Sequence, residues 1–269
     1  MNDLRRELAP VSDAAWAQIE AEAARTLKTT LAARKLVDFS GPLGWEASAV
    51  GLGRADRLEA APEERVEARL RRLQPLVELR APFELSRDEI EAIGRGAKDP
   101  DLDAVRAAAR AAAHAEDRSV FHGYEPAAIR GITQASEANA LTISDDYTRY
   151  PGVVADATNR LRDAGVDGPY AIALGPRCYA GLTKSTLNGF PVIDHVRRLL
   201  DGPIVWAPAV NGAVVLSLRG GDFELAVGQD HSLGYLDHTA AKIRLYVQES
   251  FTFRVFSPEA AVPLRYAAK

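Results

Sequence analysis

Residues 242–255 read KIRLYVQESFTFRV and carry the clearest structural signal in the chain. The apolar side chains Ile243, Leu245 and Val247 alternate with Lys242 and Arg244, which is the period of a β-strand. The alternation continues through Phe251, Phe253 and Val255. Shorter apolar strands are predicted over 170–174, 204–207 and 213–218. Because the strands gather late and no regular strand–helix alternation precedes them, the sequence predicts a mixed α+β fold.

Four helices are predicted in the first two thirds of the chain. The first covers residues 12–28, where Ser12 or Asp13 can cap the helix. Its apolar stripe must dock on another element, and it consists of Trp16, Ile19, Ala23 and Leu27. The others are predicted over 86–93, with a capping box of Ser86 and Glu89, over the alanine-rich 101–117, and over 151–164.

Residues 51–75 are rich in Arg and Glu and contain Gly51, Gly53 and Pro62, which leaves few positions for a core. Two structures fit this composition. One is an extended arm or hairpin that leaves the body of the subunit. The other is a solvated surface loop with strands at its base.

The composition excludes several classes of protein. The 269 residues are 47% hydrophobic, which suits one large domain or two modest ones, and the net charge of -4 does not suggest nucleic-acid binding. No apolar run approaches a membrane span, and residues 1–10 lack the apolar core of a signal peptide. Cys178 is the only cysteine, so an internal disulfide is impossible and a cytoplasmic location is expected.

No motif in the chain points to catalysis. None of the five histidines has a metal-binding spacing, no GxSxG turn is present, and Cys178 is interpreted as a buried small apolar residue. Gly51-Leu52-Gly53 is not followed by the third glycine of a dinucleotide loop. We therefore expect no catalytic residue, no metal and no cofactor, and a binding or structural protein rather than an enzyme.

Read end to end, the chain resembles the encapsulin family, the shell proteins of bacterial nanocompartments. The residues that carry the resemblance keep the family's order over nearly the whole chain. They lie at 8–10, 27–29, 34–38, 41–46, 75–80, 116–118, 121–123, 168–170, 219–223, 228–230, 234–235 and 248–253. The resemblance is strongest to the single-domain shell proteins, because no inserted domain interrupts the chain.

The resemblance implies a capsid fold of the HK97 type, with a peripheral domain, an axial domain and an extended loop. The expected division is an N-terminal helix and start of the peripheral domain (1–50), the extended loop (51–75), the peripheral domain with its spine helix (76–125), the axial domain (126–222) and a return to the peripheral domain (223–269). This reading favours the arm for 51–75. About 60 copies, the minimum for icosahedral closure with one subunit per position, should then form the shell.

The resemblance also implies a function. The cage would lie in the bacterial cytoplasm and enclose an enzyme through that enzyme's short C-terminal targeting peptide. A dye-decolorising peroxidase is the favoured cargo over a ferritin-like protein. The alternative is a prophage major capsid protein of the same fold. A freestanding hydrolase is a third hypothesis, without a mechanism in the sequence.

By the resemblance, the cargo peptide should bind six residues: Leu27, Arg34, Asp38, Leu233, Gly234 and Tyr235. The three larger apolar side chains would line a groove, Arg34 and Asp38 would hold polar groups at its rim, and Gly234 would let a peptide backbone approach. From the residues alone, Leu27 and Tyr235 are equally typical of a plain core.

A five-fold pore is expected at the tip of the axial domain, where Asn188-Gly189 is typical of a turn. The pore loop would comprise Thr183, Lys184, Ser185, Thr186, Leu187, Asn188, Gly189 and Phe190. Some relatives carry flavin beside a tryptophan. The corresponding stretch here, 85–89, has no tryptophan, which speaks against flavin binding.

Overall fold

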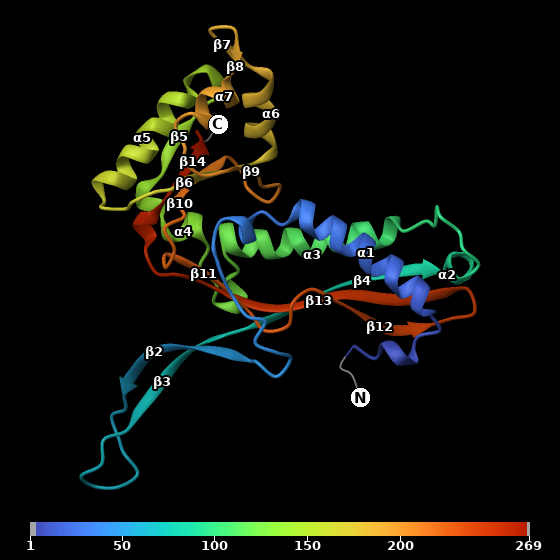
Figure 1. Ribbon diagram of the computed structural model, residues 1–269. Helices are drawn as coiled ribbons and strands as arrows, with labels where there is room; N and C mark the ends of the chain where they lie inside the picture. Colours follow the sequence, from blue (N-terminus) through green and yellow to red (C-terminus); the bar gives the residue numbers. More distant parts are fainter. Residues whose placement is uncertain (1–3, 268–269) are drawn as a thin grey trace.

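One long strand passes through both hydrophobic cores of the molecule. The computed structural model describes residues 4–267 (Figure 1), and its β13 spans Lys242–Val255. The first half of β13 contributes Ile243, Leu245 and Val247 to one cluster of buried apolar residues. The second half contributes Phe251 and Phe253 to the other. The strand pattern that dominates the sequence is confirmed, and it is the element that joins the two cores.

A five-stranded sheet forms the peripheral part of the subunit. β4 (Val77–Ser86) pairs antiparallel with one edge of β13. β11 (Phe223–Val227) and β12 (Ser232–His238) pair with β13 as well, and β1 (Asp38–Ser40) lies parallel to β11. Two helices, α1 (Asp13–Thr30) and α3 (Asp103–His122), pack on each other and cover one face of this sheet (Figure 1).

The predicted helices are confirmed, with differences at their ends. Ser12 caps α1, because its Oγ accepts a hydrogen bond from Ala15 N at 3.3 Å. α3 runs beyond the predicted 101–117, since Val120 and Phe121 continue its buried face as far as Gly123, which has a φ of 86°. The alanine run of α3 lets its neighbours approach closely.

The predicted capping box of Ser86 and Glu89 is wrong. Ser86 Oγ does cap α2 (Arg87–Gly94), but it accepts from Asp88 N at 3.2 Å. The Glu89 carboxylate accepts from Asp101 N at 2.9 Å, so it ties α2 to the loop before α3 instead.

The axial part is built around a second five-stranded sheet. Its order is β5 (Leu141–Ile143), β14 (Ala261–Tyr266), β10 (Ala213–Ser217), β6 (Tyr170–Leu174) and β9 (Ile204–Trp206). Four helices belong to this part: α4 (Ile132–Ala135), α5 (Tyr150–Asp163), α6 (Pro176–Lys184) and α7 (Val192–Arg197). Short 3₁₀ turns lie at Arg6–Leu8 (η1), Ala33–Lys35 (η2), Glu125–Ala127 (η3), Glu137–Asn139 (η4), Tyr147–Arg149 (η5) and Pro258–Ala260 (η6).

Two features of the axial part correct the expectations from sequence. β14 pairs with β10 and β5, so the last strand of residues 223–269 belongs to the axial sheet and not to the peripheral one. β6 and β9 are parallel neighbours joined through α6 and α7, which is a β–α–β connection. The sequence showed no such rhythm, because the two connecting helices are short and a hairpin interrupts them.

That hairpin forms the far end of the axial part (Figure 1, top). β7 (Thr186–Leu187) and β8 (Phe190–Pro191) pair across Asn188-Gly189, whose φ angles are 52° and 82°. These positive angles are those that an Asn-Gly hairpin turn requires, so the predicted turn is confirmed. The first two residues of the predicted pore loop, Thr183 and Lys184, are the last two residues of α6, and Phe190 is exposed at the tip.

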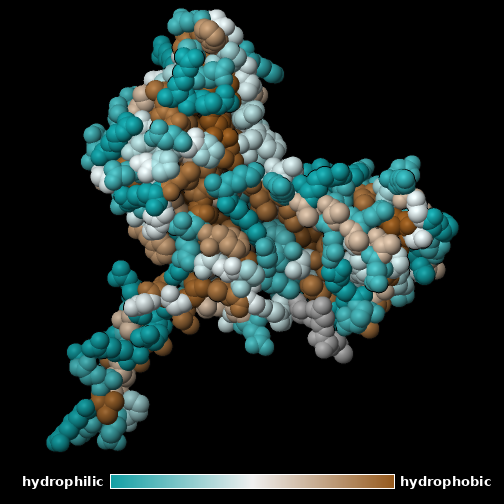
Figure 2. Space-filling model, viewed as in Figure 1, coloured by the Kyte–Doolittle hydropathy of each residue, from teal (hydrophilic) through white to brown (hydrophobic). Residues whose placement is uncertain are grey.

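Residues 51–75 form an arm, not a surface loop. β2 (Ala49–Arg57) and β3 (Arg69–Pro75) make a two-stranded hairpin that projects away from both sheets (Figure 1, lower left). Four apolar side chains on the arm are 44–61% exposed among charged ones (Figure 2): Leu58, Val66, Leu70 and Leu73. An isolated two-stranded hairpin is marginal in water. The arm therefore has the character of a contact to another copy of the chain.

No helix within residues 4–267 is long and apolar enough to cross a bilayer.

Deleting residues 53–72 tests the arm. We expect the variant to keep its circular dichroism spectrum and its cooperative melting, because both cores lie outside the arm. It should no longer form the megadalton particles expected of the intact chain, as measured by size-exclusion chromatography with light scattering. A deletion variant that still forms particles of the intact size would contradict the role of the arm.

Candidate functional site

A groove of about 270 Å³ lies between α1 and β12. Its floor is apolar, because the buried stripe of α1 faces the first residues of β12. The residues of this floor are Ala23, Leu27, Leu233 and Val247. Ala24 is exposed at its edge, and His231 and Ser232 lie at the start of β12. The groove combines apolar surface with a few polar groups, which is the character of a peptide-binding site.

The N-terminal segment lies along the same groove. Leu4 O accepts a hydrogen bond from Tyr235 N at 2.9 Å, so the segment pairs with the outer edge of β12. Arg6 pairs with Glu20 of α1 at 2.5 Å and lies over the ring of Trp16. The N-terminal segment thus forms one wall of the groove. Arg6 on this segment and Glu20 on α1 place one charge of each sign there.

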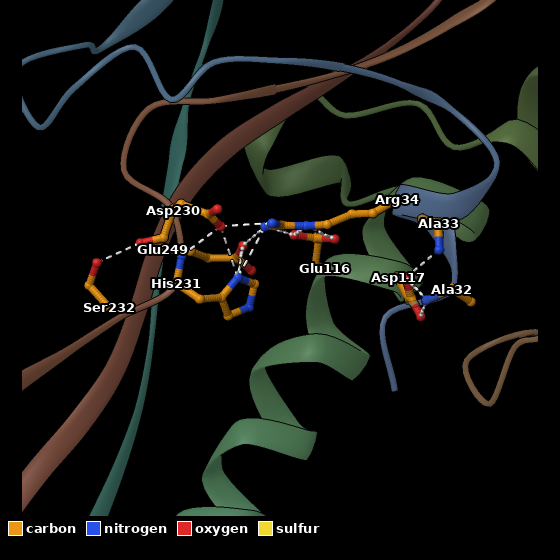
Figure 3. A network of polar contacts seen from close by, with 9 residues as sticks. All are labelled: Ala32, Ala33, Arg34, Glu116, Asp117, Asp230, His231, Ser232 and Glu249. Atoms are coloured by element: carbon orange, nitrogen blue, oxygen red, sulfur yellow. Dashed lines mark hydrogen bonds and ion pairs between the residues drawn. The ribbon is translucent and has the colours of Figure 1, made fainter. Parts of the chain in front are cut away.

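A buried ion cluster lies close to the groove, centred on Arg34 (Figure 3). Its Nη2 donates to Glu116 Oε2 at 2.6 Å, and its Nη1 donates to Asp230 Oδ1 at 2.7 Å. Glu249 Oε2 lies 3.5 Å from Nη2. Glu116 and Glu249 are 0% exposed, and the Arg34 side chain is 18% exposed. Three acidic groups from α3, β13 and the loop before β12 therefore converge on one guanidinium.

The charges of this cluster shift the protonation of its members. Burial, and then the charge of Glu116, raise the pKa of Glu249 well above its ordinary value. Burial alone would raise the pKa of Asp230, but the charge of Arg34 and a hydrogen bond from the backbone N–H of His231 outweigh it and lower that pKa. Burial disfavours the charge of Arg34, yet Glu116 and Asp230 raise its pKa further above the ordinary value. The cluster therefore favours the charged form of Arg34 and shifts Glu249 toward its protonated form.

His231 links the cluster to the groove. Arg34 Nη2 lies 3.0 Å from His231 Nδ1, and a guanidinium can only donate, so Nδ1 accepts and the proton of the neutral ring is on Nε2. Nε2 is buried and has no hydrogen-bond partner within residues 4–267. His231 is also one of the residues that line the groove, so it connects the ion cluster with this surface.

The ligand atoms of Glu116, His231 and Glu249 lie within 4.8 Å of one another, a spacing that a metal ion can use. Arg34 contacts all three side chains and already supplies a positive charge between them. Within the described residues, the arrangement is explained by an ion cluster around arginine without a metal.

The structure places the six predicted cargo-binding residues in different surroundings. Leu27 and Leu233 come together in the groove. Arg34 is not a charge at the rim, because it is the centre of the buried cluster. Asp38 lies on β1, away from the groove, and accepts from Gly221 N at 2.6 Å.

Gly234 and Tyr235 also differ from expectation. A Cβ on Gly234 would lie 2.1 Å from Cζ of Tyr246, so this glycine makes room for the Tyr246 ring and not for a peptide backbone. Tyr235 is 9% exposed, packs in the peripheral core and hydrogen-bonds His238 through its hydroxyl. Its ring is part of the core, which is the alternative to peptide binding that the sequence left open.

Sequence reasoning missed the groove residues Arg6, Glu20, Ala24 and His231, and the cluster residues Glu116 and Glu249. A signal for the last two was present. Both interrupt apolar patterns, Glu116 on the buried face of α3 and Glu249 within the alternation of β13. A charge on a face that the pattern buries indicates a buried partner.

Arg34→Leu should destabilise the folded chain by about 3–5 kcal/mol, because it leaves buried carboxylates without their cation. The measurement is denaturant unfolding followed by circular dichroism. Adding Glu116→Gln to Arg34→Leu should recover part of the loss. Arg197→Leu is the control, since it breaks the solvent-exposed ion pair with Asp194 and should leave the unfolding midpoint nearly unchanged. Equal effects of the two single variants would contradict the role of the cluster.

Glu249→Gln tests the protonation of the cluster. A carboxyl whose pKa is raised in the folded state stabilises the fold at low pH and loses that contribution as pH rises above the unfolded value of 4.5. Glutamine mimics the protonated acid, so the stability of the variant should fall less than that of the unmodified chain as pH rises from about 5 to about 8. Thermal melts across this range measure the difference. Parallel curves would show that Glu249 is ionised in the folded state.

The comparisons with known proteins agree with this architecture. A family model described as an encapsulating protein for peroxidase matches residues 1–252. The chain is 56% identical to a type 1 encapsulin shell protein of Rhodospirillum rubrum, over 98% of this chain and 97% of the relative. It is 47% identical to a type 1 encapsulin shell protein of Mycobacterium tuberculosis, over 99% of this chain and 100% of the relative.

Solved structures place the fold among viral capsids. A virus-like particle from Pyrococcus furiosus superimposes with a TM-score of 0.64 at 16% identity, covering 92% of this chain and 98% of the other. A structure from Gordonia phage Cozz gives a TM-score of 0.53 at 12% identity, covering 87% and 85%. These likenesses confirm the predicted HK97-type capsid fold, and with the family match they show that the chain belongs to the encapsulin shell-protein family.

Proposed function

We propose that the chain assembles into a closed icosahedral cage of about 60 copies and encloses a peroxidase. The groove between α1 and β12 is the observation that supports enclosure, because it offers a preformed site for a short peptide. The family description, an encapsulating protein for peroxidase, favours this cargo over a ferritin-like protein. The cage would lie in the bacterial cytoplasm, and the chemistry would belong to the cargo alone.

The groove suits a short C-terminal peptide with aliphatic side chains. Leu27, Leu233 and Val247 give an apolar surface for these side chains. The Arg6–Glu20 pair at the wall can hold polar groups of the peptide. Each contact is small, but many grooves on the inner wall of a cage would bind an oligomeric cargo with avidity.

Two further expectations belong to the same proposal. The predicted pore loop, 183–190, would line a five-fold pore, since its hairpin forms the exposed tip of the axial part (Figure 1). The nanocompartment is preferred over a prophage capsid. The relatives at 56% and 47% identity are named encapsulin shell proteins, whereas the likeness to phage structures concerns the fold alone.

Ala24→Glu tests the groove without disturbing the core. Ala24 is exposed and lines the groove, whereas Leu233 and Tyr235 are core residues whose substitution would unfold the shell. A carboxylate at this position would meet apolar peptide side chains, so capture should fall at least about tenfold. The readout is the amount of a reporter protein, fused to the C-terminal tail of the host's peroxidase, that co-purifies with shells.

Ala21→Glu is the matched control, because Ala21 is exposed on the same helix outside the groove. Both variants should form shells of the unmodified size by electron microscopy. Equal loading of the two variants would remove the groove from the proposal. A second reporter with the tail of a ferritin-like protein from the same host distinguishes the two cargo classes.

A further inference from the structure

A second cleft, of about 480 Å³, lies where the C-terminal end of α3 meets β14 and the loop before β10. It shares no lining residue with the groove between α1 and β12. Its charged lining residues are Arg118, Arg265 and, when protonated, His122, and Asn211 adds a neutral amide. Among residues 4–267, no acidic side chain lines it.

The positive charges at this cleft are only partly balanced. Arg265 pairs with Glu137 and also donates to Thr133 O at 2.9 Å. Arg177, which lies over the ring of Tyr266 behind the cleft, is neutralised by Asp145. Arg118 is exposed and forms no ion pair with any residue of 4–267. One guanidinium therefore faces the cleft without a counter-ion.

The hydrogen bonds of His122 favour its charged form. Phe121 lies in the last turn of α3, so its carbonyl has no donor within the helix, and Thr133 Oγ1 donates to it at 2.8 Å. Having used its only hydrogen, the Thr133 hydroxyl accepts from His122 Nδ1 at 3.1 Å. Ala209 O accepts from His122 Nε2, also at 3.1 Å. Both ring nitrogens can be satisfied together only when both carry a proton.

The surroundings of His122 oppose that charge. Burial lowers its pKa from the ordinary value of 6.5, and the charges of Arg118, Arg265 and His114 lower it further, against the Ala209 carbonyl. Hydrogen-bond geometry and charge thus conflict at this residue. A bound anion would remove the conflict, because it would attract all the cations at once.

We propose that the cleft is a binding site for a small tetrahedral oxyanion, phosphate or sulfate, held by the guanidinium groups of Arg118 and Arg265. His122 does not bond the anion directly, because both its nitrogens already have partners. Its protonated ring adds positive charge at the cleft wall. Anion binding and protonation of His122 should therefore strengthen each other.

Inorganic sulfate is the probe, because its charge stays constant across the titration range of histidine. Assembled shells are titrated calorimetrically at constant ionic strength, with chloride as the reference salt. Arg118→Gln should weaken sulfate binding at least about tenfold, since it removes a charged donor. Arg110→Gln is the matched control, an exposed arginine on the same helix outside the cleft, and it should bind as the unmodified shell does.

The pH dependence gives a second, independent readout. Sulfate should bind the unmodified shell at least about threefold more tightly at about pH 5 than at about pH 8. This ratio of affinities depends on how far the bound anion raises the pKa of His122, and it increases about tenfold for each pKa unit. His122→Gln should keep binding but lose this dependence. Where that variant fails to fold, Arg118→Gln decides.

Three results overturn the proposal. The first is that assembled shells bind no sulfate, whether the cleft is empty or filled by a carboxylate of a neighbouring subunit. The second is that shells of Arg118→Gln bind sulfate as tightly as shells of Arg110→Gln. The third is that unmodified shells bind sulfate with the same affinity at both pH values. None of these results predicts a change of cargo loading in the reporter assay. Failure of the anion-site proposal can therefore be distinguished from failure of the groove proposal.

Discussion

The contact between Arg34 and the buried carboxylates of Glu116 and Glu249 fixes how the two halves of the subunit meet. Arg34 lies 82 residues from Glu116 and 215 from Glu249 in the sequence. The cluster lies where β13 leaves one hydrophobic core and enters the other, at the buried polar residues Gln248 to Ser250. Apolar surfaces tolerate sliding, whereas directed bonds among buried charges allow one arrangement.

The cluster also determines the chemistry of the groove. Arg34 donates to Nδ1 of His231, and this places the remaining proton on the nitrogen with no partner among the described residues. Because His231 lines the groove, the cluster holds a side chain of the groove wall in one orientation. Asp117, next to Glu116, accepts from the backbone N–H groups of Ala32 and Ala33, and burial raises its pKa to about 7. Two successive acids of α3 thus hold the start of η2 and the side chain of its central residue, Arg34.

Regular patterns made much of the fold predictable from the sequence. The alternation in β13, the stripe of α1 and the Asn188-Gly189 turn are local signals, and all three are confirmed. For residues 51–75 the sequence left two structures open, an extended arm and a surface loop. Composition shows that such a segment has no core of its own, but not in which direction the chain runs. β14 was assigned to the wrong sheet, since a six-residue strand that contains Pro263 does not reveal its neighbours.

The candidate site was predictable only where a residue belonged to such a pattern. Leu27 followed from the helix stripe, and Leu233 from the family resemblance. His231, Glu116 and Glu249 acquire their roles from contacts between distant segments, and a single histidine or glutamate carries no local mark of its partner. Gly234 was interpreted as space for a ligand, but its missing side chain accommodates Tyr246 on the neighbouring strand.

The continuity of β13 has a mechanical consequence. Because one unbroken strand of 14 residues packs in both cores, a force that displaces one core is passed to the other through the covalent backbone of β13. This shared strand resists bending between the two cores. An assembled shell should then deform more readily in the projecting arm and in the contacts between subunits than within a subunit.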